Sequence, residues 1–370
     1  SYTLTVKKIA NTAKVSPVTG IIYGESKAMV SATGIQGTIY YSTETELTEA
    51  NYLSKGSQDI PSSSGRNAGT YNIYYYVTGN SNYNAASNTS STPVKTTISP
   101  KSIAVTWGTT TSFTYNGRAQ APSASATTGV TGETMAVTRT TGTNAGSYTS
   151  TASCSSVTGG RAKCSNYTLT GNTKAFSIER ATITAPSSPS GKNYTGSSQA
   201  SGITCPAGST AGGTTSATNA GTYTQTCTPD GNHKWSDGTT TAKSITWTIN
   251  PKSVAVTWGT TTIFTYNGKA QGPSASISTG ISTESIILGI TAEINAGSYT
   301  STASCGGVNT ALGIPGKCSN YTLTGTTKAY TINKQKVSPP TNLNVTTAGI
   351  GTWTGVSNAT SYQISMDNTN

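Results

Sequence analysis

Apolar and polar residues alternate over short stretches of the chain, the pattern of strands with one buried and one solvated face. Residues 147–154, Ser-Tyr-Thr-Ser-Thr-Ala-Ser-Cys, place Tyr148, Ala152 and Cys154 on one face and threonine and serine on the other. Asn116-Gly117 is a two-residue hairpin signal, because both positions tolerate positive φ. No long stretch has the 3.6-residue period of a helix, so the pattern predicts an all-β fold with minimal helix.

A five-residue motif, Asn-Ala-Gly-Thr/Ser-Tyr, recurs along the chain at a nearly constant interval. Its four copies begin at Asn67, Asn144, Asn219 and Asn295, at intervals of 77, 75 and 76 residues. Such a period indicates tandem structural units. Each copy marks the same turn and the same following strand.

The period divides the chain into predicted modules. We expect residues 1–8 to be the last strand of a preceding module and 9–99 to be a module with an acidic insert. We expect modules at 100–179, 180–250 (divergent) and 251–335, and a partial one at 336–370. Segments 100–179 and 251–335 are close relatives along their full length. Residues 100–179 have about seven strand-like runs, which predicts a β-sandwich for each module. Both chain ends look cut from something longer.

Several strings resemble a known family. The resemblance is carried by residues 264–271 (Phe-Thr-Tyr-Asn-Gly-Lys-Ala-Gln), 295–299, 320–325, 39–42 and 67–77. These resemble the MBG-type and related bacterial Ig-like repeats of large surface proteins, and together they extend over most of the chain. Residues 339–364 resemble the opening strands of a fibronectin type III domain. The resemblance implies tandem immunoglobulin-like β-sandwich modules on adhesin-like bacterial surface proteins; phage virion proteins also carry such modules.

Six cysteines divide into three pairs along the chain: Cys154 with Cys164, Cys205 with Cys227, and Cys305 with Cys318. The gap is 10 positions in one close relative and 13 in the other, which a disulfide tolerates better than a metal site of fixed spacing would. Zinc is the competing interpretation, but two thiolates and one distant histidine cannot complete a tetrahedral site. We therefore predict disulfides, each worth on the order of 2–3 kcal/mol, and hence an extracellular or cell-surface location.

The distribution of charged residues does not indicate a specific partner. Charged residues are 9% of the chain and the net charge is +11, but the 23 lysines and arginines are spread out and form no basic stripe. The sequence therefore disfavours nucleic acid as a partner. Diffuse positive charge fits weak attraction to anionic cell-wall polymers better. No apolar run reaches the roughly 18–20 residues that cross a bilayer, so we expect no membrane insertion in this segment.

The residues needed for catalysis are scarce. The only histidine, His233, falls in a predicted solvated turn, and the acidic cluster from Glu44 to Asp59 lacks a calcium-loop pattern. We expect no enzyme activity, no metal and no cofactor. A Lys–Asn isopeptide bond at Lys101 or Lys252 is disfavoured, because no carboxylate lies clearly in a core strand nearby.

Tyrosines of the first module are the candidate ligand-binding residues. Strand alternation places Tyr74 and Tyr76 on the face opposite Ile73, and either Tyr40 or Tyr41 must also point outward. Exposed tyrosines can stack on sugar rings. The competing interpretation, which we favour, is that they pack under the acidic insert or against the neighbouring module.

Repetition favours a structural role over a specific site. We expect a stalk or spacer within a bacterial surface adhesin, with stability determined mainly between neighbouring modules. One alternative is a carbohydrate- or matrix-binding module in residues 9–99, with a glycan, cell-wall polymer or host surface protein as partner. Another is a structural protein of a phage virion or an extracellular filament, which would self-associate.

Overall fold

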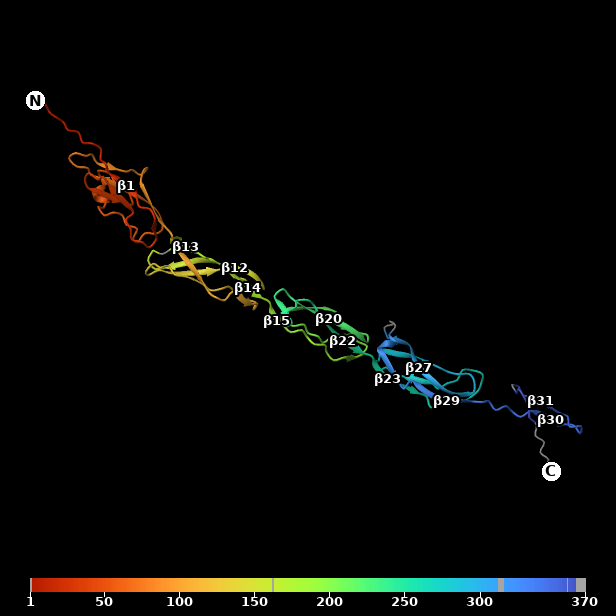
Figure 1. The fold of residues 1–370 in the computed structure, drawn as a ribbon. Helices are drawn as coiled ribbons and strands as arrows, with labels where there is room; N and C mark the ends of the chain where they lie inside the picture. Colours follow the sequence, from red (N-terminus) through yellow and green to blue (C-terminus); the bar gives the residue numbers. More distant parts are fainter. Residues whose placement is uncertain (1, 162, 312–315, 358, 364–370) are drawn as a thin grey trace. The chain divides into compact units, whose positions relative to one another are not determined.

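The regular structure of the chain is nearly all β, as a computed structural model shows (Figure 1). Strands make up 48% of the whole structure and helix 3%, which confirms the all-β prediction. The structure describes residues 2–161, 163–311, 316–357 and 359–363. The chain forms two compact units, one of residues 1–183 and 230–238, the other of 184–229 and 239–370.

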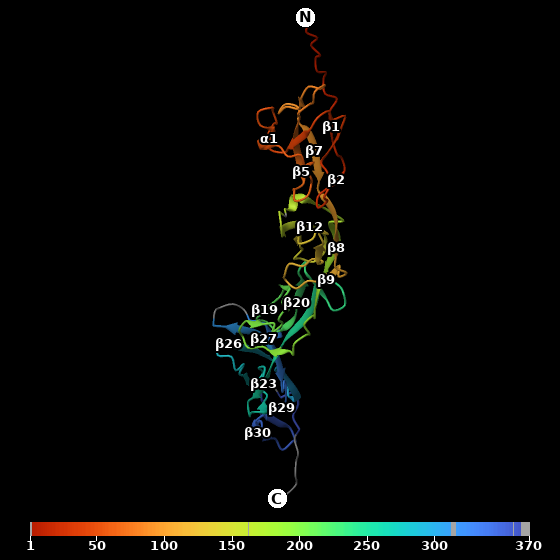
Figure 2. The ribbon, with the colours of Figure 1, turned by 90° about the vertical axis from the view of Figure 1, so that its left-hand side faces the viewer.

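In the first unit, residues 9–99 form a five-stranded sheet, a two-stranded sheet and one short helix (Figure 2). The larger sheet has the order β2-β7-β5-β4, with β6 on β5, and β1 pairs antiparallel with β3. The elements are β1 (Lys14–Pro17), β2 (Ile21–Ile22), β3 (Val30–Thr33), β4 (Ile39–Ser42), α1 (Tyr52–Lys55), β5 (Gly69–Val77), β6 (Ala86–Ser87) and β7 (Val94–Ser99). Ile21, Ile73 and Ile98 are buried between the sheets.

Residues 100–183 continue this unit with two sheets of orders β10-β8-β13 and β11-β12-β14-β9. The strands are β8 (Lys101–Trp107), β9 (Ser112–Thr114), β10 (Ala124–Ala126), β11 (Thr134–Arg139), β12 (Gly146–Thr158), β13 (Tyr167–Thr170) and β14 (Thr173–Glu179), with a 3-10 turn η1 (Cys164–Asn166). A further pair, β15 (Ala181–Ile183) and β21 (His233–Trp235), runs parallel.

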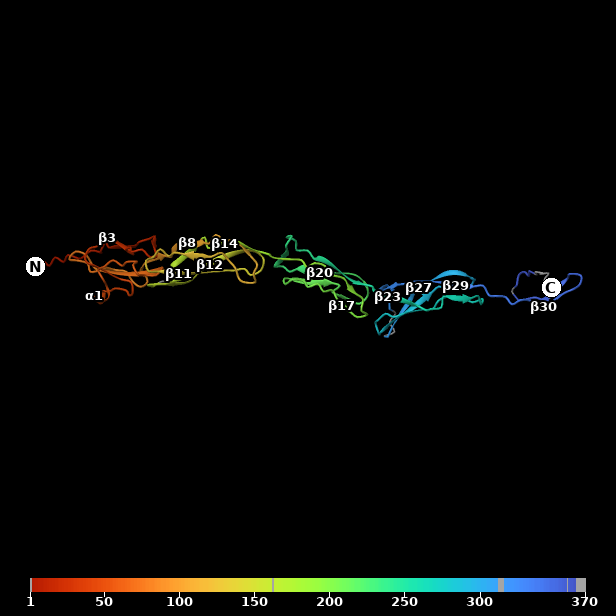
Figure 3. The same ribbon diagram turned by 90° about the horizontal axis from the view of Figure 1, so that it is seen from below.

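In the second unit, the sheets of residues 251–335 repeat those strand orders as β25-β23-β28 and β26-β27-β29-β24 (Figure 3). These strands are β23 (Lys252–Trp258), β24 (Ile263–Thr265), β25 (Ala275–Ile277), β26 (Glu284–Ile290), β27 (Gly297–Thr310), β28 (Tyr321–Thr324) and β29 (Thr327–Asn333), with a 3-10 turn η2 (Cys318–Asn320). The two close relatives in sequence therefore have the same topology.

The rest of the second unit contains one four-stranded sheet and two pairs of strands. The sheet has the order β16-β22-β20-β18, and the pairs are β17-β19 and β30-β31. The strands are β16 (Lys192–Asn193), β17 (Gln199–Ala200), β18 (Ser209–Gly213), β19 (Ser216–Ala217), β20 (Gly221–Pro229), β22 (Lys243–Asn250), β30 (Thr341–Val345) and β31 (Gly351–Thr354). The β30-β31 pair lies in the segment that resembles fibronectin type III.

The burial of the side chains along β12 agrees with the predicted alternation of buried and exposed positions. Ala152 is buried, Tyr148 and Cys154 are half-buried, and Thr149 and Ser153 are exposed. The hairpin prediction at Asn116-Gly117 is wrong, because β9 pairs with β14 and β10 with β8. Gly117 does adopt φ +75°, and the Asn116 side chain accepts the Arg118 N–H at 2.9 Å, so the pair makes a turn between different sheets.

Three disulfides are present, Cys154–Cys164, Cys205–Cys227 and Cys305–Cys318, the same pairs that the spacing predicts. They indicate an oxidising environment. Two of them tie a 3-10 turn, η1 or η2, to the long strand β12 or β27. In the part of the chain that the structure describes, no helix is long and apolar enough to cross a membrane.

Candidate functional site

A buried asparagine binds the first Asn-Ala-Gly turn from across almost 100 residues of sequence. Asn166, at the end of η1, has no exposed surface. Its Oδ1 accepts the N–H of Ala68 at 2.9 Å, and its Nδ2 donates to Oδ1 of Asn67 at 3.1 Å. We call this contact the first junction, because it joins residues 9–99 to residues 100–179.

The same pair of hydrogen bonds occurs at the next two turns. At the second junction, Asn232 accepts from the Ala145 N–H at 2.8 Å and donates to Asn144 at 3.2 Å. At the third, the corresponding bonds join Asn320 to Ala220 (2.8 Å) and Asn219 (3.1 Å). We call Asn166, Asn232 and Asn320 the junction asparagines.

An amide side chain suits this position because it offers one acceptor and two donors at once. The turn presents a backbone N–H and a carbonyl-type oxygen side by side, and an aspartate or a serine could not serve both in the same way. At the first and third junctions, Asn166 and Asn320 are buried, which makes the match necessary because a buried polar group left without a partner is costly.

A tyrosine holds each bound turn in shape. The hydroxyl groups of Tyr71, Tyr148 and Tyr223 donate to the backbone carbonyl four residues earlier, at Asn67, Asn144 and Asn219, over 2.7–2.9 Å. In the copies that begin at Asn67, Asn144 and Asn219, the motif is therefore one unit of structure: the tyrosine fixes the turn that the junction asparagine binds.

A shared carboxylate reinforces the first junction. Glu133 accepts from the Tyr23 hydroxyl through Oε1, at 2.5 Å, and from the Tyr167 hydroxyl through Oε2. The two tyrosine rings meet edge to face, with centroids 5.4 Å apart. Burial, followed by the hydrogen bond and charge of Glu133, raises the pKa of Tyr23 to about 12 and raises the pKa of Tyr167 further.

The third junction has the same arrangement around Glu284. Tyr194 donates to Oε1 at 2.6 Å and Tyr321 to Oε2 at 2.5 Å, with ring centroids 5.5 Å apart. Burial, and then the Glu284 hydrogen bond, raises the pKa of Tyr194 to about 12, and that of Tyr321 is raised as well. Both junction carboxylates therefore accept hydrogen bonds from tyrosines that stay protonated over the physiological range.

At the second junction, contacts among other side chains replace the glutamate that two tyrosines share. The Tyr115 ring meets the His233 ring edge to face, with centroids 5.3 Å apart. His233 Nδ1 lies 2.6 Å from Oδ1 of Asp230, and this contact is the main cause of the lowered pKa of Asp230. Arg180 Nε donates to the Gly231 carbonyl at 3.0 Å. His233 thus lies in β21 and is partly buried, so its predicted place in a solvated turn is wrong.

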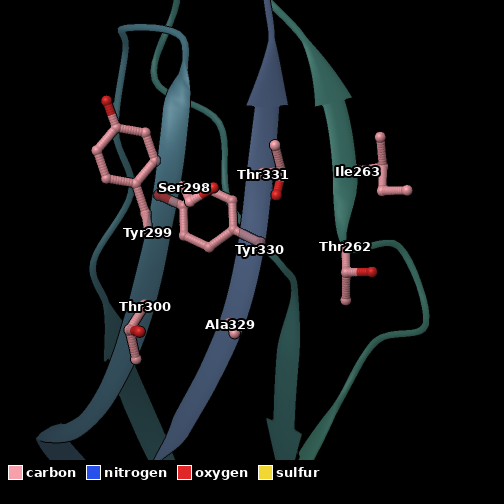
Figure 4. A pocket seen from close by; sticks show the side chains of 8 residues that line it. All are labelled: Thr262, Ile263, Ser298, Tyr299, Thr300, Ala329, Tyr330 and Thr331. Atoms are coloured by element: carbon pink, nitrogen blue, oxygen red, sulfur yellow. The ribbon is translucent and has the colours of Figure 1, made fainter.

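Small cavities adjoin the first and third junctions. One of about 290 Å³ is lined by Tyr23, Arg66 and Glu133, among others, and one of about 510 Å³ by Tyr194, Glu284 and Lys317. A third, shallow hollow of about 490 Å³ lies on the β24-β29-β27 sheet, where hydroxyl side chains surround Tyr299 and Tyr330 (Figure 4).

Of the four tyrosines predicted to bind a ligand, two are buried in the structure and two are half-buried. Tyr41 is 4% exposed in the core, and Tyr76 is 6% exposed beneath Tyr52 of α1, with ring centroids 4.7 Å apart and nearly parallel. These two cannot stack on a ligand, so that part of the prediction is wrong. Tyr40 and Tyr74 are half-buried, and Tyr40 also packs on Tyr52, as the competing interpretation expected.

The structure also shows the surroundings of Lys101 and of the possible metal ligands. Lys101, considered for an isopeptide bond, donates from Nζ to the Gly129 carbonyl at 2.8 Å. Among the described residues, no three histidine, cysteine, aspartate or glutamate side chains gather closely enough to hold a metal ion.

Sequence reasoning did not identify the junction residues. Cys-Ser-Asn-Tyr and the glutamates Glu133 and Glu284 are retained in both close relatives, which was a usable signal, but their partners lie in other repeats. No protein-family model and no curated protein matches the chain.

Proposed function

We propose that the chain is a non-catalytic spacer, built from tandem immunoglobulin-like β-sandwich modules of about 76 residues, within an adhesin-like protein at a bacterial cell surface. The shared strand orders of residues 100–179 and 251–335 support the module interpretation. The three disulfides, with their oxidising environment, support the extracellular part.

The observation that carries this proposal is the repeated junction. A spacer must hold each module at a defined distance and angle from the next. Adjacent modules must therefore not rotate freely about their linkers. The linkers between consecutive strands at the junctions are single residues, Pro100, Arg180 and Pro251. At the first and third junctions, each within one compact unit, a one-residue linker and a two-bond amide contact together restrict the angle between neighbouring modules far more than either would alone.

The test is the distribution of distances across one junction. Spin labels would be placed through unnatural amino acids at exposed Ser91 and Ser156, on either side of the first junction. We expect a narrow distribution in the native chain and a broad one in Asn166→Ala. Asn72→Ala, at an exposed residue of β5, is the matched control and should leave the width unchanged. An equally narrow distribution in Asn166→Ala would contradict the proposal.

A further inference from the structure

The first and last segments of each repeat lie side by side and run in the same direction. In residues 100–179, β8 pairs parallel with β13, and β9 pairs parallel with β14. The first pair begins with Lys101 opposite Tyr167, and the second with Ser112 opposite Ser177. The beginning and the end of this module are therefore held together twice, once in each of its two sheets.

The same pattern occurs in the other repeats. In residues 251–335, the parallel pairs are β23 with β28 and β24 with β29. In residues 180–250 they are β15 with β21 and β16 with β22. In residues 9–99 they are a bridge between Ile9 and Tyr83 and the pair of β2 with β7. Within the described residues, every parallel pairing joins the first and last segments of a repeat, and the remaining pairings are antiparallel.

Further hydrogen bonds join the two segments beyond these pairs. In residues 100–179, the Tyr115 N–H donates to the Glu179 carbonyl at 2.8 Å. The Trp107 indole N–H donates at 2.8 Å to the carbonyl of Gly171, in the turn between β13 and β14. The other close relative has both bonds again, at 2.9 and 2.8 Å, from Tyr266 to Asn333 and from Trp258 to Gly325.

A load carried along the chain reaches the two segments from opposite ends. It enters a repeat at the start of the first segment and leaves at the end of the last, because single residues, Pro100, Arg180 and Pro251, connect consecutive repeats. Since the segments are parallel, the load pulls them in opposite directions along their length. Their hydrogen bonds run from strand to strand, across the load, so the bonds of a pair must break together. Strands separated from one shared end would instead lose their bonds one at a time.

We propose that the chain carries tensile load along its length, and that the parallel contacts between the first and last segments of each repeat resist this load. This inference rests on the spacer role proposed above and adds a mechanical function to it. A spacer that holds a cell to a surface is pulled lengthwise whenever the two move apart. Each repeat places the same kind of contact in the path of that load.

The disulfides limit how far a repeat lengthens after its parallel contacts break. They close loops with sequence separations of 10, 13 and 22, in the pairs Cys154–Cys164, Cys305–Cys318 and Cys205–Cys227. An extended chain spans about 3.5 Å per residue, so reduction should lengthen the three unfolding steps by about 30, 40 and 70 Å. Residues 9–99 contain no cysteine, so their step should not change. Each repeat can therefore be recognised by its own step.

The test is single-molecule force spectroscopy of the whole chain, pulled in two ways. Pulling on the two ends loads the parallel contacts along their length. In a second form, unnatural amino acids at exposed Thr110 and Thr173 serve as anchors, just before β9 and at the start of β14, so that these strands separate from one shared end. We expect the rupture force of residues 100–179 to be about twofold or more lower in the second form. Equal urea denaturation curves of the two forms are the control for stability.

Two tryptophan variants test the contact within its own repeat. Trp107→Phe keeps an aromatic ring but loses the bond to Gly171, and Trp258→Phe loses the bond to Gly325. When the ends are pulled, Trp107→Phe should lower the force only of the step that reduction lengthens by about 30 Å, and Trp258→Phe only that of the step lengthened by about 40 Å. Each variant is thus the control for the other.

Equal rupture forces in the two pulling directions would overturn the proposal, and so would tryptophan variants that leave the force of their own step unchanged. The spin-label distances across the first junction test the spacer proposal separately. A narrow distance distribution together with equal forces would remove the mechanical function and leave the spacer. A broad distribution together with direction-dependent forces would remove the fixed geometry of the spacer and leave the mechanical resistance of each repeat.

Discussion

At the scale of single residues, the chain relies on asparagine for contacts between repeats. The junction asparagines are polar yet lie where one sequence repeat contacts the next, and each satisfies a donor and an acceptor of the same turn. Because the turn and the asparagine are both neutral, the contact carries little of the desolvation cost that a buried ion pair would have. It should therefore be insensitive to salt.

Removal of one junction amide should cost more than removal of an exposed one. In Asn320→Ala, the Ala220 N–H and Asn219 Oδ1 lose their partners at a site that is 1% exposed. We expect the free energy of unfolding to fall by about 1–3 kcal/mol, as measured by urea denaturation. Asn309→Ala, on β27 without a side-chain role at a junction, should change it by less than about 0.5 kcal/mol. Equal effects of the two variants would argue against the contact.

The junction tyrosines make the chain sensitive to alkali. The pKa of Tyr194 is raised to about 12 in the folded chain, above the value of about 10 of an unfolded tyrosine. Its contribution to stability is therefore complete below about pH 10 and is lost as the pH rises through about 12. We expect the melting temperature to fall steeply in that window.

Glu284→Gln separates the carboxylate from burial as the cause of that shift. Without the charge, the pKa of Tyr194 and Tyr321 should move back toward 10, so tyrosinate absorbance should appear at lower pH than in the native chain. Glu179→Gln, whose side chain lies away from the paired tyrosines, serves as control. An unchanged titration in Glu284→Gln would mean that burial alone raises these pKa values.

At the scale of elements, the disulfides position the junction asparagines. Cys164 and Cys318 begin the 3-10 turns that end at Asn166 and Asn320, and each is bonded to a long strand. The bond thus fixes a short turn that has little hydrophobic packing of its own. Cys205–Cys227 instead ends on β20, a regular strand within a sheet.

This difference predicts separate effects of the disulfides. In the double variant Cys154→Ser and Cys164→Ser, we expect a loss of about 3 kcal/mol for a closed loop of this length. We also expect faster hydrogen exchange at the Ala68 amide, which lies in the preceding repeat. Serine at both Cys205 and Cys227 should destabilise the chain without affecting Ala68. If Ala68 exchange is equally slow in both variants, the disulfide does not position Asn166.

At the scale of the molecule, stability should follow a nearest-neighbour rule. Contacts at the first and third junctions share no residues, and each lies within its own compact unit. Energies at sites without shared partners add. We therefore expect a substitution at one junction to leave the contribution of the other junction to stability unchanged.

The double variant Asn166→Ala with Asn320→Ala tests that rule. Its loss of unfolding free energy should equal the sum of the two single losses within about 0.5 kcal/mol. Equilibrium denaturation of the three variants and the native chain supplies the comparison. A double loss that departs clearly from the sum would show that the two junctions are coupled.

The sequence alone determined what depends on local order. Strand alternation in residues 147–154, the period of the Asn-Ala-Gly motif and the cysteine spacing gave the all-β class, the repeats and the disulfide pairs, because each is set by residues close together in the chain. The turn at Asn116-Gly117 was also recognisable, since it needs only positive φ at Gly117.

Tertiary structure decided what depends on distant partners. Which strands flank Asn116-Gly117 follows from sheet packing, and Tyr76 is covered only because α1 brings Tyr52 over it. The roles of Asn166 and Glu133 were hidden for the same reason: Ala68 lies 98 residues from Asn166, and Tyr23 lies 110 from Glu133. A hydrogen bond between repeats leaves no local pattern, since each half is an ordinary turn or strand end until the fold brings the two together.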